Sequence, residues 1–226
     1  MINELTQLKM YGAAFDDLQK YRIRVSNRLG AYDDPMGMLP SILAQTKEQE
    51  HQLSLAIQRV CRKAIPAPVL EWQKKSQGVG LHLLGLLVSS SGNPHEGYPR
   101  LFTGELDPEN PPFVRRVSDF RQYCGWGDPA RKRKKNMSAE DAKGMGNQKA
   151  KTYVYLLATS AIKEPGRAVK TNLDPEACKW PYRKVYETAR VEYATREGWT
   201  DAHQHNAAIR KVAQTILRDL WVVWPH

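Results

Sequence analysis

Hydrophobic positions in the first 30 residues repeat at the spacing of a helix. The repeat alternates between four and three residues, which is the narrow seam of a coiled coil. Its members are Tyr11, Phe15, Leu18, Arg22, Val25 and Leu29, preceded by Leu5 and Leu8. Gly30 and the turn at Asp33 to Pro35 end this helix. A second stripe follows Pro40 and stops at Pro66 and Pro68; it consists of Ile42, Thr46, Leu53, Ile57, Val60 and Ala64. The pattern predicts an antiparallel helical hairpin over residues 1–66.

This hairpin is thin, and a charged residue, Arg22, interrupts its seam. A lone pair of such helices would be marginally stable in water. Pairing with a second copy of the chain, as a coiled-coil-like homodimer or higher oligomer, is one remedy. Packing of the hairpin against the rest of the chain is the other, and the sequence leaves both open.

Residues 67–226 read as a second, helical domain. The segment from Glu71 to Val88 has a polar, basic turn with Gly78-Val79-Gly80, followed by a run patterned as a buried helix. In helix-hairpin-helix modules such glycines let backbone N–H groups approach a DNA phosphate. A lone Gly-x-Gly is more often a plain turn. It is not a nucleotide-binding P-loop, because no Gly-Lys-Ser/Thr follows.

The rest of this domain alternates between loops and amphipathic helices. Residues 89–117, rich in proline and glycine, predict a loop insertion. Helices are predicted over Gln148–Lys163, Tyr182–Arg196 and Ala207–Trp224, the last with the clearest apolar stripe. No strand pattern and no internal repeat are evident. The predicted fold class is therefore all-α.

Charge gives the strongest functional indication. The chain of 226 residues has a net charge of +10, and 37 residues from Arg115 to Lys151 hold +7 of it. The candidate DNA contacts in or near this segment are Arg131, Lys132, Arg133, Lys134, Lys135, Lys143, Asn147 and Lys149, besides Gly78, Val79 and Gly80. Lys149 lies near the start of a helix, where the helix dipole disfavours a positive charge. A phosphate bound there would offset this unfavourable interaction. Such concentrated charge favours a phosphate backbone as the partner.

Other classes of site find little support. Cys61, Cys124 and Cys178 are far apart and form no Cys-x-x-Cys pattern, which predicts free thiols and no structural zinc. His203 and His205 are better explained by a solvated helix start than by a metal site. Acidic residues are too scattered for a two-metal nuclease. The N-terminus does not resemble a signal peptide, and no apolar run could span a bilayer. We expect a cytoplasmic protein that makes no membrane contact.

Ser138 follows the basic run and is the candidate nucleophile. A serine that attacks a phosphodiester needs cations for the phosphoryl oxygens, which Arg131 to Lys135 could provide, and a base, which no nearby histidine supplies. The competing interpretation is a helix N-cap, since Asp141 stands three residues later.

The order of these motifs resembles the C-terminal part of the insertion-sequence 110 family of transposases. The similarity is carried by Arg22 to Leu29, by the Gly-Val-Gly turn, by Phe120, Tyr123, Gly125 and Pro129, by Lys143, Gly146 and Asn147, and by His205 to Trp221. The resemblance implies a coiled coil followed by a helical domain with a serine nucleophile, for which Ser138 is the only serine between Pro129 and Gly146. It also implies DNA as substrate and a structured RNA as a second ligand.

Two departures from the family matter. The RuvC-like domain, which carries the family's four acidic residues, has no counterpart in this sequence, so we expect no cofactor in this chain and Mg²⁺ only with a carboxylate-bearing partner domain. The family's serine also falls a few residues earlier, near Lys134. The sequence thus leaves three functions open: a serine-class transposase, a non-catalytic nucleic-acid-binding remnant or domesticated module, and a purely structural helical partner protein.

Overall fold

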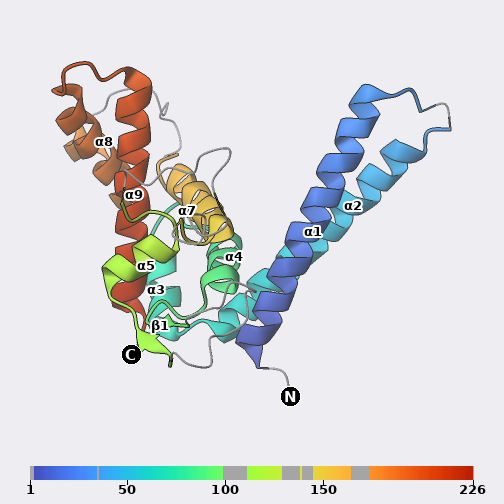
Figure 1. Cartoon of the computed structure of the whole chain (residues 1–226), viewed down its shortest axis with the longest axis horizontal. Coiled ribbons are helices and arrows are strands. Elements are labelled where there is room, and N and C mark those ends of the chain that lie inside the picture. The colour runs from blue at the N-terminus through green and yellow to red at the C-terminus, as the bar shows by residue number, and fades with distance from the viewer. Residues whose placement is uncertain are drawn as a thin grey trace.

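The computed structural model describes residues 3–34, 36–98, 111–128, 138, 145–163 and 174–225. These residues form a mainly helical molecule (Figure 1). In chain order the elements are α1 (Glu4–Ala31), α2 (Met38–Ala64), α3 (Ala67–Lys75), α4 (Leu81–Ser91), β1 (Glu96–Gly97), β2 (Phe113–Val114), α5 (Val117–Tyr123), α7 (Gln148–Ala161), the 3-10 turn η1 (Pro175–Ala177), α8 (Pro181–Ala194) and α9 (Asp201–Val223). The prediction of an all-α protein is confirmed. In the described residues, no helix combines the length and the apolar character needed to cross a membrane.

α1 and α2 lie side by side in opposite directions and project from the rest of the molecule (Figure 1). Asn3 caps α1 by accepting a hydrogen bond from the Thr6 amide at 2.8 Å. Arg22, the charged residue in the seam, has a partner across the pair, because its Nε donates to both carboxylate oxygens of Glu50 at 2.8 and 2.9 Å. The polar position therefore links the two helices at a fixed register.

The prolines near residue 66 do more than end α2. Pro66 is the N-cap of α3 and Pro68 lies in its first turn, where proline is tolerated because the first amides of a helix have no helical acceptor. The prediction that this segment is only a turn before the buried helix was wrong. For the same reason α2 begins at Met38, with Pro40 in its first turn, rather than after Pro40.

The base of the hairpin belongs to the main hydrophobic core. Leu8, Phe15, Ile57 and Val60 join the same buried cluster as α4, α7 and α9. Packing of the hairpin base on the rest of the chain is thus observed, while the division into domains at residue 66 and pairing with a second copy stay predictions.

α4 lies at the centre of the molecule and α7 runs antiparallel to it. Leu84 to Val88 are all buried. The end of α4 meets the start of α7, since the Asn147 side chain donates to the Ser90 carbonyl at 2.9 Å. α9 crosses α7 and α5 with the stripe that its sequence predicts, and α8 packs beside it (Figure 1).

The segment 89–117 contains more structure than a loop. α4 continues to Ser91, and β1 and β2 form a two-residue antiparallel ladder that pairs Glu96 with Val114 and Gly97 with Phe113. The prediction that this stretch lacks helix and strand was wrong, because strands of two residues are too short to show an alternating pattern.

Candidate nucleic-acid interface

The Gly-Val-Gly turn joins α3 to α4 and is mostly a packing element. Gly78 has φ +80° and lies so close to the last turn of α7 that a Cβ would come 2.5 Å from the Ala161 Cα. Val79 is a core residue, 2% exposed, so its side chain does not face a ligand. Gln73 of α3 donates to the Val79 carbonyl at 2.7 Å. Only Gly80, the exposed N-cap of α4, presents open backbone.

The structure separates the two halves of the predicted interface. Gly78 contacts the C-terminal end of α7, whereas Asn147 and Lys149 lie at its N-terminal end. α7 has 14 residues, which correspond to about 21 Å at 1.5 Å per residue. One phosphate cannot touch both groups, although a DNA backbone running along α7 could.

Asn147 uses its whole side chain within the protein. Its Oδ1 accepts from the amides of Lys149 and Ala150 at 3.0 and 3.1 Å, which caps α7. Its Nδ2 donates to the Ser90 carbonyl at 2.9 Å and to the Tyr123 hydroxyl at 3.2 Å. Asn147 therefore positions α7 against α4 and α5.

Lys149 already has an acidic partner. Its ammonium lies 2.5 Å from Oδ2 of Asp16 on α1, whose carboxylate is only 12% exposed. The Tyr153 hydroxyl donates to the same carboxylate. Burial and that bond raise the pKa of Tyr153. The lysine that the dipole argument assigned to a phosphate is thus held by α1, and its contact with DNA stays a prediction.

Most of the predicted basic contacts lie outside the described residues. This applies to Arg131, Lys132, Arg133, Lys134, Lys135 and Lys143. Ser138 is described and exposed. The predicted contacts between Ser138 and the cations of the basic run therefore fall outside the described residues.

The two described ends of this segment meet at one place. The chain before it makes the turn from Tyr123 to Asp128, and the chain after it returns at Met145. Gly146, with φ +74°, is wedged against this turn, since a Cβ would come 2.4 Å from the Gln122 carbonyl oxygen. The Asn147 amide donates to the Tyr123 carbonyl at 2.6 Å. The described residues on the two sides of this segment therefore lie close together.

The aromatic residues of the turn fix it to two helices. Trp126 donates through Nε1 to the Lys151 carbonyl of α7 at 3.2 Å, and its own carbonyl accepts from Gln214 of α9 at 2.8 Å. Phe120, which carries part of the family resemblance, is fully buried. Phe120, Tyr123 and Gly125, which contribute to the resemblance, thus belong to α5 and the turn that directly precede the basic segment.

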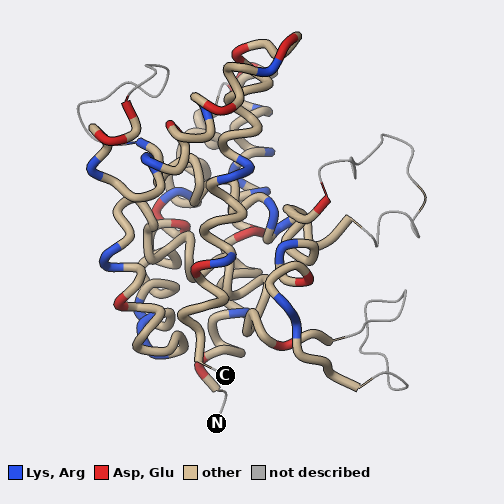
Figure 2. Tube along the Cα trace, turned by 90° about the vertical axis from the view of Figure 1, so that its left-hand side faces the viewer, with Lys and Arg blue, Asp and Glu red and all other residues tan. Residues whose placement is uncertain are grey.

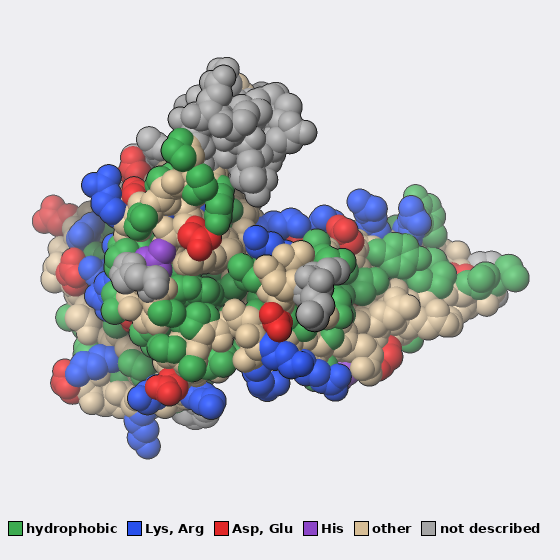
Figure 3. Space-filling model, turned by 90° about the horizontal axis from the view of Figure 1, so that it is seen from below, with side chains coloured by type: hydrophobic (Ala, Val, Ile, Leu, Met, Phe, Trp, Pro, Cys, Tyr) green, Lys and Arg blue, Asp and Glu red, His purple; other side chains and the backbone are tan. Residues whose placement is uncertain are grey.

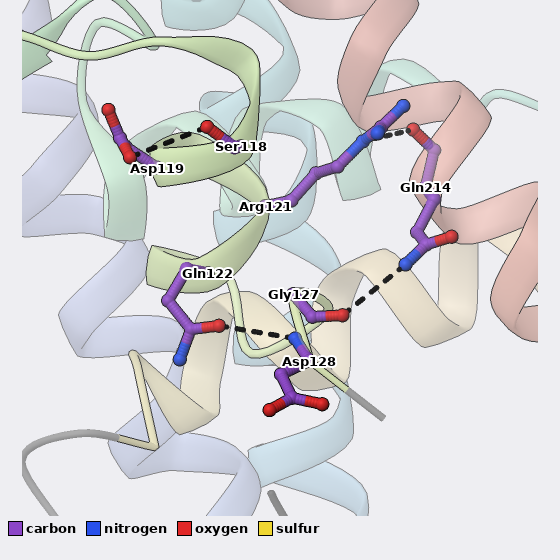
Figure 4. Close-up of a pocket in the computed structure, with 7 residues that line it drawn as sticks. All are labelled: Ser118, Asp119, Arg121, Gln122, Gly127, Asp128 and Gln214. Carbon is purple, nitrogen blue, oxygen red and sulfur yellow. Dashed lines mark hydrogen bonds between the residues drawn. The ribbon is translucent and has the colours of Figure 1, made fainter. Parts of the chain in front are cut away.

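A polar cavity of about 430 Å³ opens between α5 and α9 beside this turn (Figure 4). Its lining residues are Ser118, Asp119, Arg121, Gln122, Gly127, Asp128 and Gln214. The Arg121 Nε donates to the Gln214 carbonyl at 3.1 Å, and the Asp128 amide donates to Gln122 at 3.3 Å. The cavity lies where the chain passes from Asp128 into the basic segment.

Basic side chains that sequence reasoning missed continue from this cavity along α9. A second hollow, of about 370 Å³, shares Gln214 with the first and contains Arg196, Arg210 and Lys211 together with two aromatic rings. The Arg196 guanidinium lies 4.6 Å from the ring centre of Tyr193 and 4.7 Å from that of Trp199. We use the name α9 face for Arg210, Lys211 and Arg218 of α9 together with two neighbours, Arg121 of α5 and Arg196 between α8 and α9.

The α9 face is positive but also contains acids. Burial, followed by the nearby charge of Arg218, lowers the pKa of Arg121. Asp219 pairs with Arg218 at 2.7 Å, and Glu192 lies 3.8 Å from Arg196. Figure 2 shows that the described Lys and Arg residues are distributed over several helices of the molecule.

Comparison with protein-family models, curated proteins and solved structures finds no match for this chain. The likeness to the insertion-sequence 110 family therefore depends on the order of the motifs in the sequence.

Metal and thiol chemistry gain no support from the described residues. Among them, no group of three His, Cys, Asp or Glu side chains is placed to hold a metal ion. His205 accepts or donates a hydrogen bond with the Tyr186 hydroxyl at 2.7 Å, which gives it a packing role. Cys61 and Cys124 are free thiols, and burial raises the pKa of Cys61 to about 12 and that of Cys124 further.

Proposed function

We propose that this chain is a DNA-binding, transposase-like protein that acts in DNA transposition or recombination. The observation that carries the proposal is the placement of +7 of the +10 net charge between Arg115 and Lys151. DNA phosphates bind such segments because each neutralised phosphate releases condensed counterions. Both ends of residues 129–144 are fixed to the turn at Tyr123–Asp128, beside the α9 face.

Ser138 supplies the chemical step in this proposal. Its Oγ attacks a DNA phosphorus atom and forms a serine–phosphate ester, while the bond to one deoxyribose oxygen breaks and that oxygen takes up a proton. Arg131, Arg133 and Lys135 neutralise the phosphoryl oxygens. Exposure of Ser138 makes it accessible to a large substrate.

The second candidate is a non-catalytic module that binds nucleic acid through the basic segment. In such a module Lys149, paired with Asp16, and Asn147, bonded to Ser90 and Tyr123, serve the fold. Contacts of the basic segment to phosphates alone would position the protein on DNA without reading its sequence.

The partners follow from the resemblance and from the hairpin. A separate carboxylate-bearing domain would bring Mg²⁺, and a structured RNA would be a second ligand. Hydrophobic side chains reach the projecting end of the hairpin (Figure 3), where Tyr32, Met36 and Met38 are 72%, 81% and 57% exposed. We propose that this end pairs with a second copy, and that the protein acts in the cytoplasm.

Incubation with end-labelled duplex and branched DNA, followed by denaturing electrophoresis, tests the chemical step. We expect a covalent protein–DNA band with the wild type and with Ser118→Ala, a control at another exposed serine, and none with Ser138→Ala. DNA binding without a covalent band in any of the three proteins would favour the non-catalytic module. A band that persists in Ser138→Ala would reject Ser138 as the nucleophile.

A further inference from the structure

Three arginines of the described chain are buried, and one of them differs from the others. Arg183 pairs with Glu187, and Arg190 pairs with Asp201. Arg115 is 5% exposed, and no carboxylate of the described residues lies within ion-pair distance of it. Its Nη1 has no hydrogen-bond acceptor. A buried charge without an ion-pair partner is costly, so a bound anion would stabilise Arg115, for which the described residues provide no such partner.

The Arg115 side chain is held in place by its surroundings. Its amide donates to the His95 carbonyl at 2.7 Å, and its carbonyl accepts from Trp221 Nε1 at 3.1 Å. The guanidinium lies over the Tyr123 ring, 4.1 Å from the centroid. Burial lowers the pKa of Arg115 from its ordinary value, but a guanidinium stays protonated at neutral pH. A fixed, charged donor group results.

Arg115 forms part of the wall of a pocket of about 480 Å³. The first turns of α1, the end of α4, β1 and Tyr123 complete it. Lys9 of α1 adds a second cation, with no ion pair in the described chain. The volume lies within the range of small-molecule sites.

The polar groups of the pocket leave these two cations available. The serine hydroxyls at the end of α4 donate to carbonyls of their own helix. The one acid in the described lining, Glu96, accepts from Asn93 at 2.8 Å and from the Tyr98 hydroxyl. Within the described residues, this carboxylate forms no ion pair with Arg115.

We propose that this pocket binds a phosphate monoester through the guanidinium of Arg115 and the ammonium of Lys9. A phosphate monoester has nearly two negative charges at neutral pH, which match the two cations. The planar guanidinium suits its oxygens. The group could belong to a free nucleotide or to the 5′ end of a nucleic acid. This site differs from the basic run Arg131–Lys135, and most of its described wall comes from residues 89–98 and Arg115, which lie in the stretch predicted as an insertion.

Isothermal titration with inorganic phosphate and with a deoxynucleoside 5′-monophosphate tests the site on the purified chain. We expect saturable binding by the wild type, at least tenfold weaker binding by Arg115→Met, and unchanged binding by the control Arg116→Met, which alters the exposed neighbour of Arg115. Acetate should not compete. Lys9→Met, on an exposed position, should also weaken binding, and it keeps the test open if Arg115→Met does not fold.

Comparison of 5′-phosphorylated and 5′-hydroxyl oligonucleotides as competitors distinguishes the two sources of the phosphate. Competition by the phosphorylated form alone identifies nucleic-acid ends, and competition by neither, with nucleotide binding intact, identifies free nucleotides. Absence of phosphate binding by the wild type, equal binding by acetate, or wild-type affinity in both Arg115→Met and Lys9→Met would overturn the inference. None of these results depends on DNA binding by the basic segment.

Discussion

At the residue scale, Asp16 connects the hairpin to the rest of the molecule. Its carboxylate, only 12% exposed, accepts from Lys149 and from the Tyr153 hydroxyl of α7, so two donors lose their acceptor if it is removed. We expect Asp16→Ala to lower the free energy of unfolding by about 1–3 kcal/mol. Asp17→Ala is the matched control, because Asp17 is exposed and pairs with Lys20 on its own helix; its cost should be clearly smaller, since exposed ion pairs add little stability. Urea unfolding measures both, and equal effects would contradict the connection.

His82 gives the protein a predicted pH dependence. Burial lowers its pKa from the ordinary 6.5, and the ring lies 3.0 Å from the Ser54 hydroxyl and against Phe15. The folded state thus binds fewer protons than the unfolded state below pH 6.5. Stability is fully present above that value and is lost as pH falls through 6.5 toward the lowered pKa, by about 1.4 kcal/mol for each unit of difference.

Thermal unfolding between pH 7.5 and 5.5 tests this sign. We expect the decline in melting temperature to shrink in His82→Gln and to persist in His51→Gln, since His51 is exposed on α2. A decline of the same size in His82→Gln would show that other groups cause it.

At the element scale, the sequence predicted helices well where one face is continuously apolar. The stripe of α9 from Ile209 to Leu220 is buried as predicted, because a 3.6-residue period directly reports a buried face. The sequence did not predict α3, because proline in the first turn of a helix and proline after the last turn of a helix give similar local patterns. The β1–β2 ladder was missed because it contains only two residues in each strand.

The two glycines of the Gly-Val-Gly turn allow a matched comparison, because Gly78 is packed against α7 and Gly80 is exposed. Gly78→Ala would place a Cβ 2.5 Å from the Ala161 Cα at a positive φ, so we expect a loss of more than about 2 kcal/mol in the free energy of unfolding. Gly80→Ala meets nothing within 4 Å, at φ −73°, and should cost less than about 1 kcal/mol. If Gly80 contacts a DNA phosphate, this second variant weakens DNA binding while the protein stays folded. Equal stability of the two variants would contradict the packing of Gly78.

At the scale of the whole molecule, topology decided what the sequence could not. Periodicity identified α4 and α7 separately, but their antiparallel packing places Gly80 and Asn147 at opposite ends of the pair. The roles of Asn147 and Lys149 also depend on partners that are distant in sequence, Ser90 and Asp16. The sequence identified Arg115 only as one charge of the basic stretch. Its burial depends on the packing of β2, α5 and α9, which are distant in sequence or not predicted.

The projecting end of the hairpin should control oligomeric state. We expect the wild type to form a dimer in analytical ultracentrifugation, and a triple substitution of Tyr32, Met36 and Met38 by serine to give a monomer. The same change at Tyr155, Val191 and Val222, which are exposed elsewhere, should leave the dimer intact. A monomeric wild type, or a dimer that survives the first variant, would contradict pairing through this end.

The central claim is that the basic segment binds DNA. The most direct measurement is the affinity for a labelled duplex, by fluorescence anisotropy, as a function of salt. Replacement of Arg131 to Lys135 by glutamine should weaken binding and reduce the slope of log K against log salt by up to about 4.5, at about 0.9 for each lost phosphate contact. The control replaces Arg24, Arg28, Lys47, Arg59 and Lys63, exposed on the hairpin, with glutamine and changes the net charge equally. We predict a nearly unchanged slope for the control; equal loss in both variants, or no salt-dependent binding by the wild type, would contradict the account.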